Sequence, residues 1–316
     1  MKLYPNCKIN IGLRVVRKRE DGYHDLETIF YPVYGLHDEL EVDAMENSEF
    51  RVQNYEFIQK GLAVDCPAED NLIIKCYLHM RARYPQIGDV RIRFKKNIPF
   101  GAGLGGGSSD AAHMAIALNE IFKLGLTKEQ LAQEIRPLGA DCPFFVYNTP
   151  CYAEGIGDQL TPIPLDLSGL RLIMIKPQCG VSTKEAYGGI VPKGSGIKEF
   201  KSSYLGRASN DYSQSDFLGV KELFNVAHND FEDTVFKLRP EIAAIKKRLQ
   251  AAGALYAAMS GSGSTVFGLF TTQLSSTLLN STQHYSESRT NTELRLLHEE
   301  FAQMIIFDNT LGQTQS

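Results

Sequence analysis

The chain has 316 residues, of which 43% are hydrophobic and 22% are charged, and its formal net charge is −4 at pH 7. This composition is ordinary for a globular protein and argues against extended disorder. A slightly acidic chain has no general attraction for nucleic acid or an anionic membrane, so we expect a small-molecule partner instead. The length exceeds the commonest size of a single hydrophobic core, and we therefore expect two domains.

Cysteine usage and the lack of apolar runs bear on localisation. The six cysteines include no Cys-x-x-Cys pair and no spacing typical of a zinc site, so we expect reduced thiols in a reducing compartment. No apolar run approaches the roughly 18 residues of a membrane helix, and the first residues resemble neither a signal peptide nor a transit peptide. We expect a cytoplasmic protein. No acidic cluster identifies ligands for a metal, and the sequence does not determine an oligomeric state.

The N-terminal part of the chain is predicted to open as a β-hairpin. Apolar and polar residues alternate over residues 8–16, a second extended run covers residues 28–34, and Glu20-Asp21-Gly22 supplies a turn between them. Asp70-Asn71 then caps a helix that ends at Pro85.

A strand at residues 89–95 leads into the most unusual segment of the chain. The basic residues in and beside this strand are expected on its solvent face: Arg91, Arg93, Lys95 and Lys96. Residues 99–110 then contain five glycines and run directly into a helix that starts near Ser108 and ends near Phe122. Glycine has the largest conformational entropy cost of folding, so five glycines in twelve residues indicate a functional requirement for this backbone.

After Thr149-Pro150 the sequence changes to short extended pieces that alternate with Gly and Pro. We predict a boundary there, with an N-terminal domain of residues 1–150 and a C-terminal domain of residues 151–316. The polar residues 193–217 are typical of a loop or insertion. The remaining predicted elements are a helix over residues 127–135 that begins with a capping box, extended pieces at 151–154 and 170–175, a helix from Pro240 to before Gly253, a hairpin of 254–259 and 265–270, and a helix near 293–304.

The glycine-rich segment predicts a phosphate site, because glycine lets main-chain amides approach a ligand and the helix start adds unpaired amides and a positive dipole end. The P-loop pattern fails, since Gly107 stands where lysine is needed. The dinucleotide pattern matches formally at three glycines, but the chain after the helix does not continue as that fold requires. Those three are Gly101, Gly103 and Gly106.

Residues 99–112 resemble the second signature of the GHMP kinases, the superfamily of galactokinase, homoserine kinase, mevalonate kinase and phosphomevalonate kinase. Further segments narrow the resemblance to the branch whose substrate carries a cytidine diphosphate group: residues 8–13 with 21–24, residues 139–144, and residues 259–265. The motifs follow the family's order over roughly residues 1–270. The resemblance implies a two-domain α/β (α+β) fold with the active site in the cleft between domains. It also implies ATP-dependent phosphorylation of a substrate hydroxyl on the non-mevalonate route to isoprenoid precursors, with Mg²⁺ accompanying ATP.

The resemblance also implies roles for individual residues. Asp141 is the residue that accepts the hydroxyl proton, and Lys8 lies beside it and the transferred phosphoryl group. A cap for the turn that follows is the alternative role for Asp141. The residues expected to bind ATP are Asn71, which also caps its helix, and Pro99, Gly101, Ala102, Gly103, Leu104, Gly105, Gly106, Gly107, Ser108 and Ser109. For Asp110, a simple cap of the helix start is the alternative role.

The substrate side is expected to use aromatic rings and a second glycine motif. Tyr23 and His24 resemble the pair that holds the cytosine, and Tyr187 is the ring expected on its other face. Asn10 and the motif residues Gly261, Ser262 and Gly263 are expected near the phosphates and the substrate diphosphate. Three alternatives remain at this point: another kinase of the superfamily for mevalonate or homoserine, an NAD-dependent oxidoreductase, and a non-catalytic nucleotide-binding protein.

Overall fold

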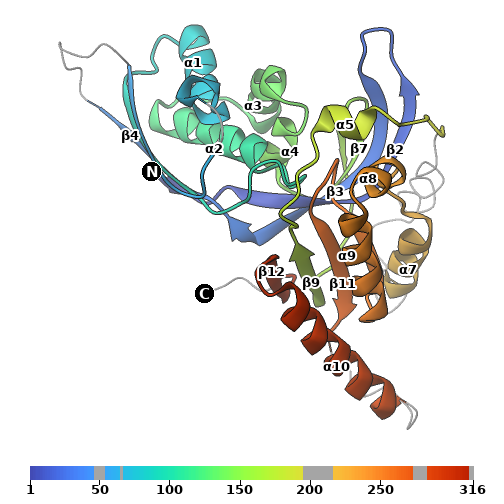
Figure 1. The fold of residues 1–316 in the computed structure, drawn as a ribbon. Coiled ribbons are helices and arrows are strands. Elements are labelled where there is room, and N and C mark those ends of the chain that lie inside the picture. Colours follow the sequence, from blue (N-terminus) through green and yellow to red (C-terminus); the bar gives the residue numbers. More distant parts are fainter. Residues whose placement is uncertain (46–53, 65–66, 195–215, 273–282, 313–316) are drawn as a thin grey trace. The chain divides into compact units, whose positions relative to one another are not determined.

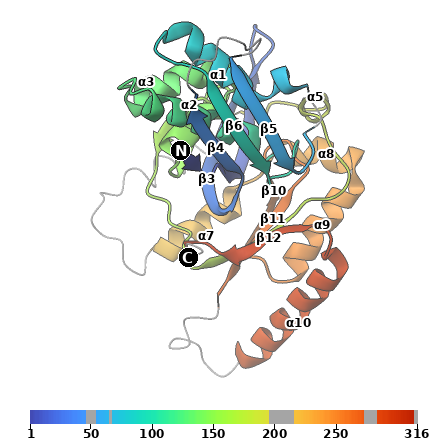
Figure 2. The ribbon, with the colours of Figure 1, turned by 90° about the vertical axis from the view of Figure 1, so that its left-hand side faces the viewer.

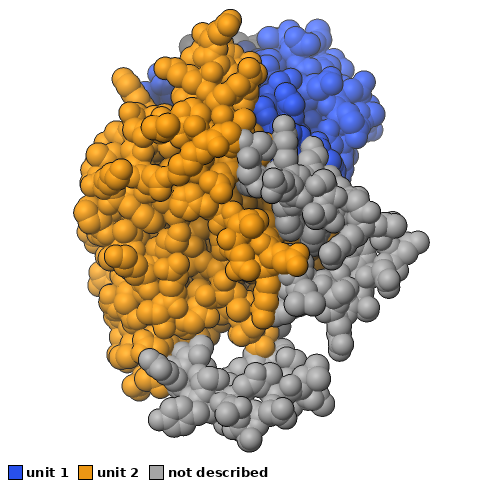
Figure 3. Space-filling model, turned by 90° about the vertical axis from the view of Figure 1, so that its right-hand side faces the viewer, with its two compact units in different colours: residues 1–8, 30–100, 104–162 blue, residues 9–29, 101–103, 163–316 orange. Residues whose placement is uncertain are grey.

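The computed structural model describes residues 1–45, 54–64, 67–194, 216–272 and 283–312. The chain divides into two compact units, coloured separately in Figure 3: unit 1 comprises residues 1–8, 30–100 and 104–162, and unit 2 comprises residues 9–29, 101–103 and 163–316. The units combine several chain segments, so they do not decide where a single boundary would fall. The predicted boundary near residue 150 stays a prediction.

In its described residues, unit 1 contains a four-stranded sheet and four α-helices. The sheet has the order β1-β4-β6-β5, in which β5 runs parallel to β6 and the other pairs are antiparallel. Figures 1 and 2 show helices α1, α2 and α3 gathered on one face of this sheet. The elements are β1 (Lys2–Leu3), β4 (Glu39–Ala44), β5 (Tyr55–Gly61), β6 (Val90–Lys96), α1 (Leu72–Arg83), α2 (Gly106–Ile121), α3 (Lys128–Ile135) and α4 (Cys142–Tyr147).

Local signals explain where the helices of unit 1 begin. The Asn71 side chain accepts a hydrogen bond from Ile73 N (2.9 Å) and caps α1, as predicted. Thr127 and Gln130 form the predicted capping box of α3. Helix α2 begins at Gly106, two residues before the predicted start, because Gly105 takes the N-cap position with a left-handed φ of 69°. Three small residues, Gly106, Gly107 and Ser108, therefore form its first turn and are half-buried.

Strands β2 (Asn6–Lys18) and β3 (His24–His37) form the predicted N-terminal hairpin, and each carries residues of both units. They belong to a sheet of order β2-β3-β7-β8, completed by β7 (Cys151–Glu154) and β8 (Gln159–Pro162). The turn between them closes with Arg19 N donating to Tyr23 O (2.8 Å). Within this turn Gly22 has a φ of 87°, as its turn signal requires.

Unit 2 contains an antiparallel sheet of order β10-β11-β9-β12, in which β11 and β9 are the central strands. Helix α9 packs on this sheet through Ile242, Ile245 and Leu249, which are buried. The elements are β9 (Leu170–Ile175), β10 (Tyr256–Met259), β11 (Val266–Thr271), β12 (Ile305–Thr310), α5 (Thr183–Tyr187), α7 (Asp216–Val226), α8 (Glu232–Leu238), α9 (Pro240–Ala251) and α10 (Gln283–Phe301).

Several C-terminal predictions can be compared with unit 2. The helix that begins at Pro240 and the hairpin around residues 260–264 are confirmed. The helix expected near residues 293–304 is longer at its start, since α10 begins at Gln283 and ends at Phe301. The loop predicted at residues 193–217 falls almost wholly on residues 195–215, outside the described residues. Of the described helices, none has the length and apolar character of a membrane span.

Candidate active site

Unit 1 brings the two predicted catalytic residues together. Lys8 lies on β2, with its side chain only 3% exposed, and its Nζ is 3.5 Å from Oδ2 of Asp141. The same Nζ lies 5.1 Å from the centre of the Phe30 ring. Burial lowers the pKa of Lys8, and the Asp141 carboxylate opposes this shift by favouring the ammonium form. The Lys8 ammonium is therefore buried and in contact with the Asp141 carboxylate.

Asp141 occupies the N-cap position of α4, but its side chain makes no capping hydrogen bond. The turn closes instead through backbone groups, with Cys142 N donating to Gly139 O (3.1 Å). The side chain of Asp141 is 31% exposed, so one face of the carboxylate is open while Lys8 contacts the other. This arrangement argues against the capping role and leaves the carboxylate accessible to a hydroxyl group.

The glycine-rich segment reaches Lys8 at the start of α2. Lys8 N donates a hydrogen bond to Leu104 O (3.0 Å). A Cβ on Gly105 would lie 2.9 Å from the Phe145 ring and 3.1 Å from Cε of Lys8. Only glycine combines this left-handed φ with such a close approach. The first amides of α2 therefore begin directly beside the Lys8 side chain.

The other residues predicted to bind ATP are placed as follows. Asn71 caps α1 and is 9% exposed, which confirms its capping role. Pro99 is half-buried, and Gly106, Gly107 and Ser108 form the first turn of α2. Ser109 is fully buried, and its hydroxyl lies 3.4 Å from Nδ1 of His113, so its side chain is directed into the protein. Their roles toward a nucleotide stay predictions.

In unit 2 the glycines 101–103 contact the predicted Ser/Gly motif. The Ser260 hydroxyl donates to Gly103 O (2.9 Å), and Thr265 N donates to Ala102 O (3.3 Å). A Cβ on Gly103 would lie 2.1 Å from Ser260 O, and its φ is 76°, so this approach requires glycine. The two motifs therefore form one pair of loops, although Gly103 and Ser260 are 157 residues apart in the chain.

Asn10 joins this pair of loops and is almost fully buried. Its backbone N donates to the Ser260 hydroxyl (3.3 Å), and its side-chain Nδ2 donates to the Thr28 hydroxyl (3.0 Å). In the other part of the motif, the Ser262 hydroxyl lies 3.4 Å from that of Thr183. The side chain of Asn10 is thus held by protein groups, and its donation to a substrate stays a prediction.

The aromatic residues predicted to hold a base also lie in unit 2. His24 and Tyr187 stack on each other, with ring centroids 4.6 Å apart and an interplanar angle of 24°. Phe231 meets Tyr187 edge-on at 4.8 Å, and Tyr23 is 61% exposed at the end of the hairpin. Burial lowers the pKa of His24, with Lys18 adding to the shift. Since the two rings touch, a base can stack between them only after they separate.

One prediction on the basic strand is wrong. Lys96 is not on the solvent face of β6 but is 2% exposed, and its Nζ contacts Asp38 (2.5 Å) and Asp110 (2.8 Å). Asp110 therefore does not cap the helix start but points into the protein, and burial raises its pKa. The alternation that directs Arg91, Arg93 and Lys95 outward places Lys96 inward.

The sequence analysis also missed a group of buried polar residues in unit 2, Asn229, Asp230 and Glu232. They are at most 2% exposed and contact the backbone of β2 and of the Ser/Gly motif. The signal was the polar run His228-Asn229-Asp230 between two helical segments, which ordinary loop composition does not distinguish.

Comparison with known proteins follows the same motifs. Residues 71–149 match the family described as GHMP kinases N terminal domain, and residues 211–281 match GHMP kinases C terminal. A 4-diphosphocytidyl-2-C-methyl-D-erythritol kinase of Bacteroides fragilis is 44% identical over 272 residues, which cover 85% of this chain and 92% of the relative. The protein of the same name from Porphyromonas gingivalis is 40% identical over 271 residues, with coverage of 85% and 92%.

Solved structures agree with this assignment. A crystal structure of 4-(cytidine 5'-diphospho)-2C-methyl-D-erythritol kinase has a TM-score of 0.65 and 28% identity, covering 93% of this chain and 96% of that one. Mevalonate kinase from Staphylococcus aureus shares the fold at a TM-score of 0.55 with 16% identity, covering 99% of each chain. The chain belongs to the GHMP kinases. This confirms the α/β fold class, implies the use of ATP, and makes the dinucleotide pattern of the glycines a formal match only.

Proposed function

We propose that this chain transfers the γ-phosphoryl group of ATP to the 2-hydroxyl of 4-diphosphocytidyl-2-C-methyl-D-erythritol. The single observation that carries the chemistry is the Lys8–Asp141 pair, 3.5 Å apart and adjacent to Gly105 at the start of α2. The choice of acceptor is supported by the names of relatives that are 40–44% identical over most of the chain. The aromatic residues of the N-terminal hairpin support it further.

In this proposal Asp141 accepts a hydrogen bond from the attacking hydroxyl and receives its proton. The hydroxyl oxygen forms a bond to the γ-phosphorus, the bond from that phosphorus to the bridging oxygen breaks, and ADP leaves with the electron pair. The proton on Asp141 then passes to solvent through its exposed face. The ammonium of Lys8 stabilises negative charge on the transferring oxygens, and the amides at the start of α2 bind the phosphates.

Recognition of the acceptor is assigned to Tyr23, His24 and Tyr187. A flat base stacks on aromatic faces with about 1–3 kcal/mol per contact. Burial lowers the pKa of His24, which favours the uncharged imidazole as a stacking face. Binding is expected to separate His24 from Tyr187 or to use the exposed ring of Tyr23.

Mg²⁺ is proposed to arrive with the nucleotide. In the described parts of the chain, no three His, Cys, Asp or Glu side chains lie together as a metal site. Magnesium commonly binds through substrate phosphates, with few protein carboxylates and several waters. The side chains present do not form a dedicated site, and no step of the proposal is assigned to the metal.

The test is the release of ADP with 4-diphosphocytidyl-2-C-methyl-D-erythritol, run beside mevalonate and homoserine at equal concentration. We expect turnover with the cytidyl compound alone, since the other two acceptors have no base to stack. Turnover only with mevalonate or homoserine would overturn the acceptor and retain the kinase. Phosphorus NMR of the product checks that the 2-hydroxyl is the position modified.

A further inference from the structure

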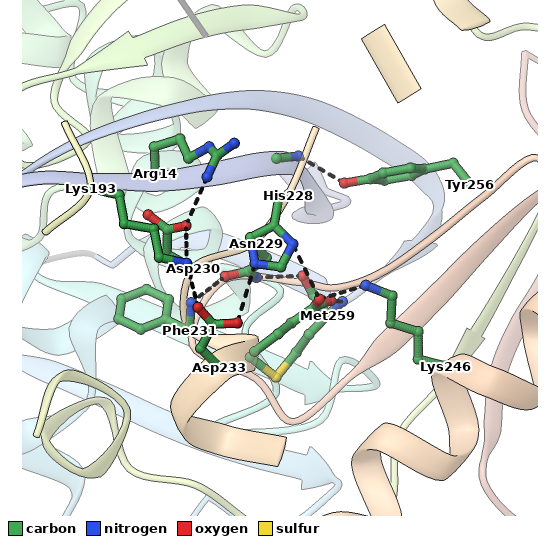
Figure 4. Close-up of polar contacts among 12 residues, drawn as sticks. Arg14, Lys193, His228, Asn229, Asp230, Phe231, Asp233, Lys246, Tyr256 and Met259 are labelled. Atoms are coloured by element: carbon green, nitrogen blue, oxygen red, sulfur yellow. Dashed lines mark hydrogen bonds and ion pairs between the residues drawn. The ribbon is translucent and has the colours of Figure 1, made fainter. Parts of the chain in front are cut away.

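The segment between α7 and α8 carries buried polar side chains that the proposed reaction does not use. Asn229 and Asp230 are each 1% exposed, and Glu232 is 2% exposed. Figure 4 shows Asn229 directed toward the backbone at Met259, the last residue of β10, and Asp230 directed toward Arg14. Burying so many polar groups costs free energy unless each is hydrogen-bonded, so their contacts indicate what the segment holds.

Asn229 holds the start of the Ser/Gly motif, residues 260–264. Its Nδ2 donates to Met259 O (2.7 Å) and to Gly261 O (2.8 Å), and its Oδ1 accepts from Phe231 N (3.0 Å). One carboxamide thus binds the carbonyl groups of the two residues that flank Ser260 and also fixes its own loop. Both of its N–H donors are engaged by these carbonyls.

Neighbouring side chains fix the segment that carries Asn229. Glu232 accepts a hydrogen bond from Met259 N (2.8 Å) and forms an ion pair with Lys246 (2.5 Å). Asp230 accepts from Val15 N (2.9 Å) and contacts Arg14 (3.2 Å), which attaches the segment to β2. Contacts on both sides therefore fix this segment, so that it can hold the motif in place and does not simply move with it.

The motif passes this constraint to residues with proposed roles. The Ser260 hydroxyl donates to Gly103 O (2.9 Å) and accepts from Asn10 N (3.3 Å). Ser260 is itself fully buried, so its hydroxyl cannot follow a displaced backbone without losing these bonds. A shift at Gly261 would therefore change the position of Gly103 and the surroundings of Asn10.

We propose that Asn229 is a positioning residue for the phosphoryl transfer, acting through the backbone of residues 259–261 on the Ser/Gly motif and the glycines 101–103. This rests on the proposed function of those two loops. Asn229 touches no reacting atom in this account. Its contribution is to hold the loops in the geometry that binds the ligands, so its loss is expected to weaken ligand binding.

The test compares Asn229→Asp with Asn119→Asp. Asn119 is a matched control, because it also clamps a backbone, donating to Leu126 O (3.1 Å) and accepting from Leu126 N (3.0 Å) between α2 and α3. Both changes remove N–H donors and keep the acceptor oxygen. Amide hydrogen exchange at residues 261–264 is measured first, followed by KM and kcat with both substrates. We expect faster exchange and a KM raised about tenfold for Asn229→Asp only.

Other outcomes discriminate between explanations. A purely structural role would lower the active fraction, so kcat would fall with KM and motif exchange unchanged, and this result would overturn the proposal. If Asn229→Asp does not fold, Asn229→Ala removes the same donors without burying a charge, and the same expectation applies. If wild-type protein shows no turnover with the cytidyl substrate, the proposed function fails, whereas faster exchange confined to residues 261–264 would still support the clamp.

Discussion

Unit 1 buries two lysines against neighbouring positions of one glycine-rich turn, and their surroundings differ in the number of carboxylates that each ammonium contacts. The Lys8 Cε lies 3.1 Å from where a Cβ on Gly105 would be, and the Lys96 Nζ lies 3.1 Å from the same point on Gly106. Both side chains are at most 3% exposed. Lys8 contacts one carboxylate at 3.5 Å, whereas Lys96 contacts two at 2.5 and 2.8 Å.

The difference in partners reverses the direction of the pKa shift. Burial disfavours the charged form of both lysines. For Lys8 burial prevails and its pKa is lowered. For Lys96 burial is outweighed by Asp110 and Asp38 together, and its pKa is raised. The ammonium of Lys8 lies beside a partly exposed carboxylate, where a ligand can approach, while that of Lys96 is enclosed by two buried carboxylates and stabilises the fold.

The largest expected effect tests the exposed partner of Lys8. Asp141→Asn keeps the size of the side chain but cannot accept the hydroxyl proton, and we expect kcat for ADP release to fall about 10²–10⁴-fold. Nucleotide affinity, measured by calorimetric titration, should stay unchanged. Asp166→Asn is the control, because Asp166 accepts a hydrogen bond from Ser168 N (2.8 Å) within an exposed turn. Turnover of Asp141→Asn within a few-fold of wild type would remove Asp141 from its role.

The next largest effect is the difference in stability that is lost when each lysine is replaced by methionine. Lys96→Met leaves Asp38 and Asp110 buried without a cation, and we expect the free energy of unfolding to fall by about 3–5 kcal/mol. Lys8→Met removes an ammonium whose burial is itself unfavourable, so the free energy of unfolding should fall by only about 1 kcal/mol. Urea denaturation of both variants gives the comparison. Equal losses would show that Lys8 is as structural as Lys96.

These two lysines also show what the sequence could predict. Local sequence signals predicted the hairpin, the Asn71 cap, the capping box of α3 and the glycine-rich turn, because each depends on residues that are close in the chain. Lys8 was identified through a resemblance of motifs. The inward direction of Lys96 follows from the alternation along β6. Its contact with Asp38 could not be predicted, because Asp38 lies 58 residues away in the chain and local periodicity does not show which distant carboxylate a buried strand residue meets.

The same reason explains the elements that were not predicted. Strand β5 pairs in parallel with β6, and β12 joins a sheet whose other strands precede it by more than thirty residues. Asn229 was missed because its significance lies in two carbonyls of a motif thirty residues further along the chain. Such long-range pairings decide which polar side chains are buried, and a single sequence carries no pattern for them.

A smaller effect sharpens the contact between the turn and Lys8. Gly105→Ala places a Cβ against Phe145 and Cε of Lys8, at a residue with φ of 69°. Gly125→Ala is a matched control, since its φ is 71° but no atom lies within 4 Å of its Cβ. Both should lose about 1–2 kcal/mol of stability to left-handed backbone strain. Only Gly105→Ala should also lower kcat, about tenfold, by displacing the ammonium. Equal kcat in both variants would show that the Lys8 side chain adapts.

The smallest effect is the pH dependence of stability, in which the two lysines act with opposite sign. For Lys8, whose folded pKa is lowered, the unfolded state binds more protons as pH rises toward the ordinary lysine value of about 10.4, so stability relative to Lys8→Met should increase with pH. For Lys96, whose folded pKa is raised, stability relative to Lys96→Met is fully present below about 10.4 and should decrease as pH rises through the raised value. Each slope is at most about 1.4 kcal/mol per pH unit. Urea unfolding of wild type and both variants between about pH 8 and 11 measures the differences, in which other titrating groups cancel. Slopes of the same sign would mean that the number of carboxylate partners does not set the charge state of these two ammonium groups.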